Sequence, residues 1–165
     1  MRKIHGGGDL PLIECVDVRR GTWAVRCDKQ DDGENGYSYA EVFVSHKPSL
    51  SEIKEIVIGY YNEQIDKRIV EGFSWNGKSV WLSTENQFNY KAAADLAVQT
   101  GGQTLPVTFK FGSGETADYY EFTTVDELMD FYAHAMAYVS RVLAEGWQEK
   151  DGIDWSAYQE EEGEV

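Results

Sequence analysis

The feature that most constrains the fold is the stretch GFSWNGKSVWLSTENQ, which runs from Gly72 to Gln87. The glycine at its start can end a preceding helix. Asn76 and Gly77 tolerate the positive φ angles that a two-residue hairpin turn requires. Ser83 then offers a side-chain oxygen that can cap a following helix. These signals predict a helix, a tight β-hairpin and a second helix in direct succession.

Residues 1–48 predict a small N-terminal β module. Its Gly-rich start, residues 1–9, is expected to be a flexible arm or an arm that only a partner orders. Alternating apolar and β-branched residues then predict a three-stranded antiparallel meander. The expected strands are Leu10–Val18, Thr22–Cys27 and Tyr37–Ser45, with a polar loop over 28–36.

Residues 49–153 predict the order helix, hairpin, helix, hairpin, helix. Ser49 and Glu52 have the spacing of a capping box at the start of the first helix. Apolar residues recur in the helices at spacings of three and four, as in an amphipathic helix. The expected helices are 50–71, 85–99 and 125–147, and the expected hairpins are 73–82 and 106–122. The predicted fold class is therefore α+β, with residues 154–165 as an acidic tail.

The charge of the chain is strongly acidic and unevenly distributed. The net charge is −14, and residues 123–165 contain 2 Lys/Arg against 11 Asp/Glu. Such a segment repels nucleic acid and anionic lipid, so neither is an expected partner. We expect the residues from Lys150 onward to be frayed or ordered only by a partner. A solubilising tail is the favoured interpretation, and an acidic inhibitor that imitates DNA is an alternative.

The sequence has no apolar run long enough for a membrane span and no apolar core of a secretory signal near its start. Folding in a cytoplasm is therefore expected. Cys15 and Cys27 are expected to be buried thiols rather than a disulfide.

No catalytic or metal-binding motif stands out. His5, His46 and His134 fall in three different predicted elements, which gives no zinc-site spacing. The loop 28–36 lacks the bidentate Glu of a calcium loop. The sequence therefore predicts no catalytic residue, cofactor or metal.

A small glycan-cleaving enzyme would need two carboxylates at a controlled separation in a cleft. The available pairs are Asp31 with Asp32 and Asp126 with Asp130. They fall in a predicted loop and on a predicted solvated helix face, so this alternative is not favoured.

Aromatic residues of the two hairpins are the candidates for partner contact. Trp75 and Trp81 flank the first hairpin, and Tyr119 and Tyr120 lie on the second. Such rings can stack on a sugar or a base. The favoured interpretation is structural, because aromatic residues opposed across two strands stabilise a hairpin.

Two stretches of the chain resemble a known family. KRIVEGFSWNGKSVWLSTENQFNY, residues 67–90, is similar to the start of an uncharacterised domain of tailed-bacteriophage proteins, often encoded near tail-fibre genes. Residues 123–153 are similar to the far end of that domain, including Lys150 and Ile153. The residues that match the family pattern in the first stretch are Arg68, Gly72, Phe73, Trp75, Gly77 and Gln87. The resemblance covers about 49–153.

The resemblance implies a non-enzymatic role in the tail or tail-fibre region of a phage, and it supplies no catalytic residues. The expected location is the virion, after synthesis in the host bacterial cytoplasm. The expected partners are other phage structural proteins, with the chain in multiple copies or as a homo-oligomer. A tail-fibre assembly chaperone that is absent from the virion is the first alternative.

Overall fold

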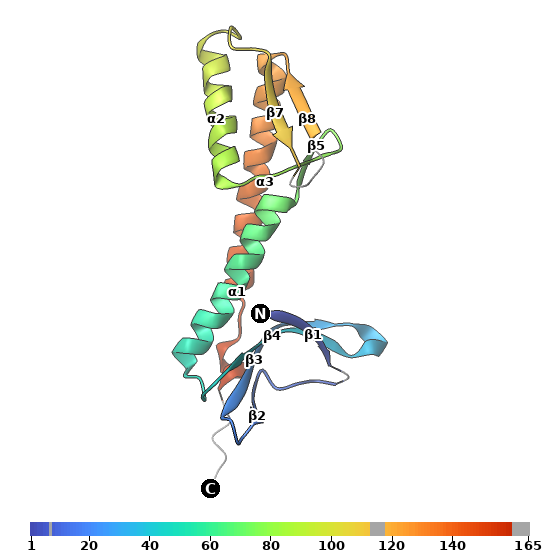
Figure 1. Ribbon diagram of the computed structural model, residues 1–165, viewed down its shortest axis with the longest axis vertical. Helices are drawn as coiled ribbons and strands as arrows, with labels where there is room; N and C mark the ends of the chain where they lie inside the picture. The colour runs from blue at the N-terminus through green and yellow to red at the C-terminus, as the bar shows by residue number, and fades with distance from the viewer. Residues whose placement is uncertain (7, 113–117, 160–165) are drawn as a thin grey trace. The chain divides into compact units, whose positions relative to one another are not determined.

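The structure, a computed structural model, describes residues 1–6, 8–112 and 118–159 (Figure 1). It confirms the α+β class: a four-stranded antiparallel sheet is followed by three helices with β-hairpins between them. The chain divides into two compact units. We call residues 1–62 with 150–165 the N-terminal unit and residues 63–149 the central unit.

The N-terminal sheet has one strand more than the predicted meander. Its strands are β1 (Arg2–Gly6), β2 (Ile13–Asp17), β3 (Thr22–Asp31) and β4 (Tyr37–Val44), in the order β1-β4-β3-β2. The prediction that residues 1–9 form an arm was therefore wrong for β1. This strand pairs antiparallel with β4, and Ile4 lies opposite Tyr39. That pairing buries β4 between two neighbours.

The boundaries of the other strands also differ from the prediction. The strand expected at 10–18 covers only Ile13–Asp17, and β3 continues to Asp31 into the predicted polar loop. The β3–β4 register shifts between Cys27 and Gln30, where Asp28 has a φ of 52°. This irregularity lets the polar residues that follow it remain in the strand. A short 3-10 helix, η1 (Gly33–Asn35), precedes β4.

Helix α1 (Leu50–Glu71) begins at the predicted capping box. The Glu52 carboxylate accepts a hydrogen bond from the Ser49 backbone N–H at 2.8 Å, and the Ser49 hydroxyl oxygen accepts one from the Glu52 N–H at 3.3 Å. Ile53 and Val57 of this helix are buried against Val25 and Cys27 of the sheet. Both cysteines are free, and burial raises the pKa of the Cys27 thiol to about 12.

The end of the described chain is part of the same core. Helix α3 (Val125–Asp151) extends past the predicted end at 147, and a 3-10 helix, η2 (Trp155–Tyr158), follows it. Tyr158 is 8% exposed and belongs to the core of the N-terminal unit. Residues 150–159 are thus ordered by the chain itself, contrary to the prediction. Residues 160–165 of the predicted acidic tail lie outside the described part.

The central unit contains two hairpins and two helices beside the end of α1. Its elements are β5 (Phe73–Trp75), β6 (Lys78–Val80), α2 (Thr84–Gln99), β7 (Val107–Phe111), β8 (Asp118–Phe122) and most of α3. Helix α2 and the β7–β8 hairpin both lie alongside α3 (Figure 1). Of the predicted second turn, residues 113–115 lie outside the described chain.

Phe131 of α3 lies at the centre of the aromatic core of the central unit. Its ring centroid lies 4.9 Å from that of Phe122, 5.1 Å from that of Tyr90 and 5.5 Å from that of Trp75. Phe131 is fully buried. One ring therefore joins α2, α3 and both hairpins.

The predicted independence of residues 1–48 as a module stays a prediction. The core against which their sheet packs includes Ile53, Val57 and Tyr158, which lie outside that stretch.

Candidate binding pocket beside the first hairpin

The first hairpin forms as the sequence predicts. Asn76 and Gly77 have φ values of 46° and 76°, the left-handed conformation that a two-residue turn of this kind requires. The turn sets the register of β5 and β6, in which Trp75 lies opposite Lys78 and Phe73 lies opposite Val80. The side chains of Phe73 and Val80 are buried in the core of the central unit.

Gly72 permits a close approach between α1 and α3. The Arg68 carbonyl oxygen accepts hydrogen bonds from the Gly72 N–H at 3.0 Å and from the Tyr138 hydroxyl at 2.6 Å. A Cβ atom at position 72 would meet the Tyr138 hydroxyl oxygen and would lie 2.7 Å from the Arg68 carbonyl oxygen. Burial raises the pKa of the Tyr138 hydroxyl above its usual value, so the hydroxyl stays protonated and can donate.

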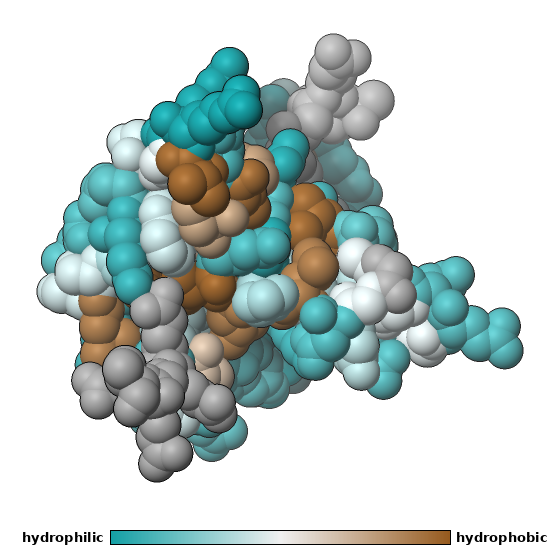
Figure 2. Space-filling model, turned by 90° about the horizontal axis from the view of Figure 1, so that it is seen from below, coloured by the Kyte–Doolittle hydropathy of each residue, from teal (hydrophilic) through white to brown (hydrophobic). Residues whose placement is uncertain are grey.

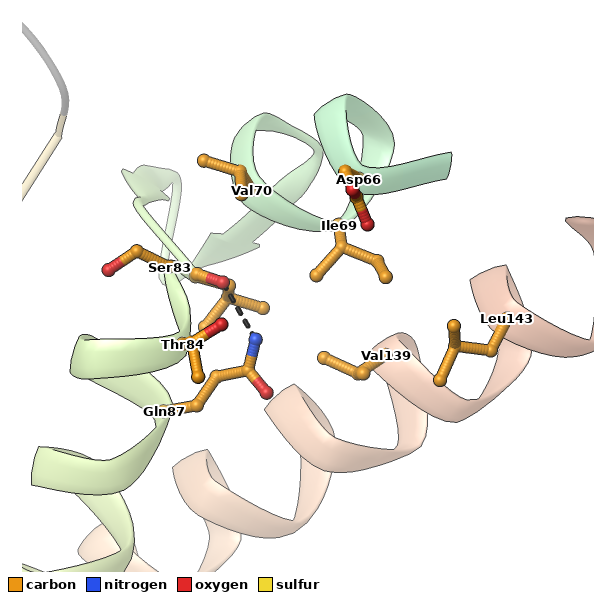
Figure 3. Close-up of a pocket in the computed structure, with 9 residues that line it drawn as sticks. Asp66, Ile69, Val70, Ser83, Thr84, Gln87, Val139 and Leu143 are labelled. Atoms are coloured by element: carbon orange, nitrogen blue, oxygen red, sulfur yellow. Dashed lines mark hydrogen bonds between the residues drawn. The ribbon is translucent and has the colours of Figure 1, made fainter. Parts of the chain in front are cut away.

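Helix α2 begins directly after the hairpin and closes one side of a pocket. The Ser83 hydroxyl oxygen accepts a hydrogen bond from the Asn86 N–H at 3.3 Å, which confirms the predicted cap. The Gln87 amide donates to the Leu82 carbonyl oxygen at 2.8 Å (Figure 3). This bond fixes the Gln87 side chain at the edge of the pocket.

The pocket has a volume of about 460 Å³ and lies among α1, the start of α2 and α3. Figure 3 shows the side chains of Ile69 and Val139 pointing into it from opposite sides. Its lining residues are Asp66, Ile69, Val70, Leu82, Ser83, Thr84, Gln87, Val139 and Leu143. Such a lining suits an apolar side chain with a few polar contacts at the rim.

The pocket lining contains few ionisable groups. Asp66 is the one charged residue among the described residues that line it. General acid–base catalysis on a glycan needs a second carboxyl group at a set distance, and none of these lining residues supplies one. In the ranges 1–6, 8–112 and 118–159, no group of three or more His, Cys, Asp or Glu residues is placed to hold a metal ion.

The two tryptophan candidates do not oppose each other across the hairpin. Trp75 pairs with Lys78, and Trp81 follows the end of β6, so the predicted cross-strand contact of these rings is wrong. Trp75 instead packs on Phe131 and lies 5.7 Å from the His134 ring of α3. Trp81 is half-buried, and its carbonyl oxygen accepts a hydrogen bond from the Asn86 amide at 2.9 Å. The structure therefore gives Trp75 a place in the core.

The two tyrosine candidates have different surroundings. Tyr119 is 62% exposed on β8. The Tyr120 hydroxyl accepts a hydrogen bond from the Asn76 amide at 2.6 Å and donates one to the Glu127 carboxylate at 2.6 Å. Tyr120 thereby links the first hairpin to α3, which sequence reasoning missed. Of this pair, Tyr119 remains the candidate for partner contact.

The other polar candidates do not come together in a site. His5 lies 3.0 Å from Asp32 and His46 lies 2.8 Å from Glu52, both at exposed positions. Asp31 accepts a hydrogen bond from the Gly33 N–H at 2.8 Å, as expected of a turn residue. In α3, Asp130 pairs with the exposed His134 at 3.2 Å. Asp31, Asp32 and Asp130 are thus engaged in local contacts.

Exposed hydrophobic side chains occur in both units. On the face shown in Figure 2, hydrophobic residues are interspersed with hydrophilic ones. The large exposed hydrophobic residues of the N-terminal unit are Val16, Val18, Phe43 and Ile58. Scattered residues of this kind are normal on a protein surface. No helix within the described ranges combines the length and apolarity that crossing a membrane requires.

The chain belongs to the DUF4376 family, a domain of unknown function, which it matches over residues 52–164. Comparisons with curated proteins and with solved structures give no significant match. The family match includes α1 from its third residue onward, both hairpins, α2 and α3, and therefore the whole pocket.

Proposed function

We propose that this protein is a non-enzymatic structural or assembly protein of a tailed bacteriophage, associated with the tail or tail fibre. In this role it is made in the host cytoplasm, incorporated into the virion in several copies, and bound to other phage structural proteins.

The observation that carries the proposal is the resemblance of residues 67–90 to a domain of tailed-phage proteins. Most of the residues that match that pattern serve the fold. Gly72 lies under the Tyr138 hydroxyl, Gly77 forms the turn, and Gln87 binds the Leu82 carbonyl oxygen. A pattern made of residues that set the architecture supports a structural role in this proposal.

The charged groups of the central unit support the same proposal. Arg68 forms a paired hydrogen bond with Glu149, with both N–O distances at 2.8 Å, and Arg141 pairs with Glu145 at 2.8 Å. Lys78 pairs with Asp118. All three pairs lie at the surface; those of Arg68 and Lys78 join neighbouring elements, and that of Arg141 lies within α3. Active sites, by contrast, gather ionisable groups with strongly perturbed pKa values in a cleft.

Mass spectrometry of purified phage particles tests the proposal. We expect peptides of this chain in mature virions at a copy number consistent with the symmetry of the tail. Presence in infected-cell lysate with absence from particles would instead favour the assembly chaperone. Absence from both would contradict the proposal.

The acidic character of the chain leaves the DNA-mimic inhibitor as a second candidate function. Several carboxylates of the last quarter are engaged within the chain, including Glu127, Glu145 and Glu149. A DNA mimic needs such carboxylates unpaired and spaced along its surface. Binding of a basic host protein by a variant that lacks residues 160–165 would support this candidate. The deletion must not start before residue 160, because Tyr158 belongs to the core.

A further inference from the structure

The pocket beside the first hairpin combines apolar side chains with polar groups. Leu82 is fully buried and Ile69 is 7% exposed, and together with Val139 and Leu143 they form the apolar part of the lining. Asp66 is exposed, and Figure 3 shows it on α1 at the edge of the same pocket. A ligand that fits such a lining has an aliphatic part and a polar end.

Two hydrogen-bond acceptors of this pocket are free to meet a ligand. Within the described ranges, no hydrogen bond or ion pair engages the Asp66 carboxylate. The Gln87 amide nitrogen donates to the Leu82 carbonyl oxygen at 2.8 Å, which leaves the Gln87 amide oxygen as an acceptor. A polar end with several N–H donors therefore matches both groups.

The charge around the pocket is negative. Glu85 lies in the first turn of α2, next to the lining residue Thr84, and adds a second carboxylate near that of Asp66. Lys67 and Arg68 follow Asp66 in the sequence but line a separate pocket. The net charge of the whole chain is −14, which attracts cationic partners. The polar end of the ligand is therefore expected to be a cation.

The start of α2 does not reverse this charge. Unpaired N–H groups at the beginning of a helix attract anions. Here the Ser83 hydroxyl oxygen accepts a hydrogen bond from the Asn86 N–H, and the Ser83 carbonyl oxygen accepts one from the Gln87 N–H. The carboxylate of Glu85 offsets the positive end further.

We propose that this pocket binds an arginine side chain of a partner protein. The aliphatic part of the arginine packs on Ile69 and Val139, and its guanidinium group donates to the Asp66 carboxylate and the Gln87 amide oxygen. This inference rests on the proposed assembly role for the class of partner, which is another structural protein of the same particle.

Other side chains fit the lining less well. A purely apolar side chain would cover Asp66 without pairing its charge, which is unfavourable. An acidic side chain would be repelled. A lysine ammonium is a compact and strongly hydrated point charge, whereas the planar guanidinium group can serve two acceptors at once.

Titration of the full chain with a blocked arginine, Nα-acetyl-arginine N-methylamide, is the first test. Nuclear magnetic resonance should show saturable shifts at the amides of the lining residues up to about 50 mM probe, because one side chain alone binds in the millimolar range. Blocked citrulline has nearly the same shape without the charge, and it should bind at least about threefold more weakly. Equal binding of the two probes, or no saturable shift, would overturn the proposal.

Variants at exposed positions of α1 test the carboxylate. Asp66→Asn should weaken the binding of blocked arginine by about three- to tenfold, because the charged acceptor is lost. Glu71→Gln is the matched control: Glu71 is exposed on the same helix and is not among the described residues that line this pocket. It removes the same charge and should leave the affinity unchanged. Equal weakening by the two variants would mean general attraction to an acidic surface and would overturn the site.

Three further probes test which part of the ligand the pocket recognises. Methylguanidinium lacks the aliphatic part, blocked lysine lacks the planar group, and free arginine has charged groups in place of the two peptide bonds. All three should bind more weakly than blocked arginine, or in the case of free arginine no more tightly. Tighter binding of free arginine would identify a site for the free amino acid, and equal binding of methylguanidinium or blocked lysine would remove the selectivity. Each of these results would overturn the proposal.

The two proposals fail separately. A chain that is found in virions but does not bind blocked arginine would refute the site and leave the assembly role standing. A chain that binds blocked arginine but is absent from particles and from infected cells would refute the assembly role.

Discussion

Arg26 and Glu41 form an ion pair inside the N-terminal sheet. Arg26 of β3 lies opposite Glu41 of β4, its Nε donates to Glu41 Oε2 at 2.9 Å, and both side chains are 5% exposed. The Arg26 guanidinium also donates to Glu14 at 2.8 Å and to the Pro11 carbonyl oxygen at 2.7 Å. Arg2 of β1 donates to the second Glu41 oxygen at 3.1 Å. One carboxylate thus holds three of the four strands together through two arginines.

Arg26→Met should destabilise the N-terminal unit by about 3–5 kcal/mol, because it leaves the Glu41 carboxylate buried without its closest partner. The double variant Arg26→Met with Glu41→Leu should recover most of this loss, since it removes both buried charges. Urea unfolding followed by circular dichroism, together with hydrogen exchange of the β3 and β4 amides, measures both effects. A double variant as unstable as the single one would contradict the explanation.

Replacement by alanine should change stability in opposite directions at Gly59, inside α1, and at Gly72, directly after it. Gly72→Ala should destabilise the central unit by about 1–3 kcal/mol, because the added methyl group meets the Tyr138 hydroxyl and the Arg68 carbonyl oxygen. Gly59→Ala should stabilise the protein by about 0.4–1 kcal/mol, because the residue is helical and no atom of the described chain outside the adjacent residues and helix backbone lies within 4 Å of the new Cβ. Thermal unfolding of the two variants compares them directly. Equal effects of the two changes would exclude the steric cause.

The elements that sequence predicts well depend on residues close together in the chain. The capping box at Ser49 and Glu52, the turn at Asn76 and Gly77, and the cap at Ser83 each involve at most four consecutive positions. Their chemistry is local, so it can be deduced without knowing the rest of the fold. The hairpin register follows from the same turn, and it shows why Trp75 and Trp81 cannot be opposed.

The elements that sequence reasoning missed depend on distant partners. Strand β1 is ordered by β4, whose residues lie more than thirty positions away, and a glycine run beside it resembles a flexible arm. An acidic tail follows the helix η2. Its composition favoured the prediction of a frayed end, although Trp155 and Tyr158 are apolar enough to join the core. The pocket could not be predicted from the sequence either, because its lining residues Asp66, Gln87 and Val139 come from three separate helices.

Tyr119 and Tyr120 should differ in their effects on stability. Tyr120→Phe removes the hydroxyl that binds Asn76 and Glu127, and we expect a loss of about 1–2 kcal/mol in the free energy of unfolding. Tyr119→Ala should change stability by less than about 0.5 kcal/mol, because the ring is exposed. Chemical denaturation of the two variants measures this. A larger loss for Tyr119→Ala would show that its ring supports the fold, and would remove it as a candidate for partner contact.

The cap of α1 should give the protein a specific response to acid. The pKa of Glu52 is lowered from its ordinary value of 4.5 to about 2, first by the Ser49 backbone N–H, then by His46 and by the Ser49 hydroxyl. Because the folded-state pKa lies below the unfolded one, the stabilisation by ionised Glu52 is complete above pH 4.5 and is lost as the pH falls toward about 2.

Titration of the Glu52 carboxyl carbon by nuclear magnetic resonance measures this pKa. His46→Ala should raise it only part of the way to 4.5, since the Ser49 backbone N–H remains bound. Glu52→Gln keeps an acceptor for that N–H, so the helix should still form, while the unfolding free energy should fall less steeply between pH 4.5 and 2. A Glu52 pKa near 4.5 in the unaltered protein would show that the capping box does not hold the carboxylate in solution.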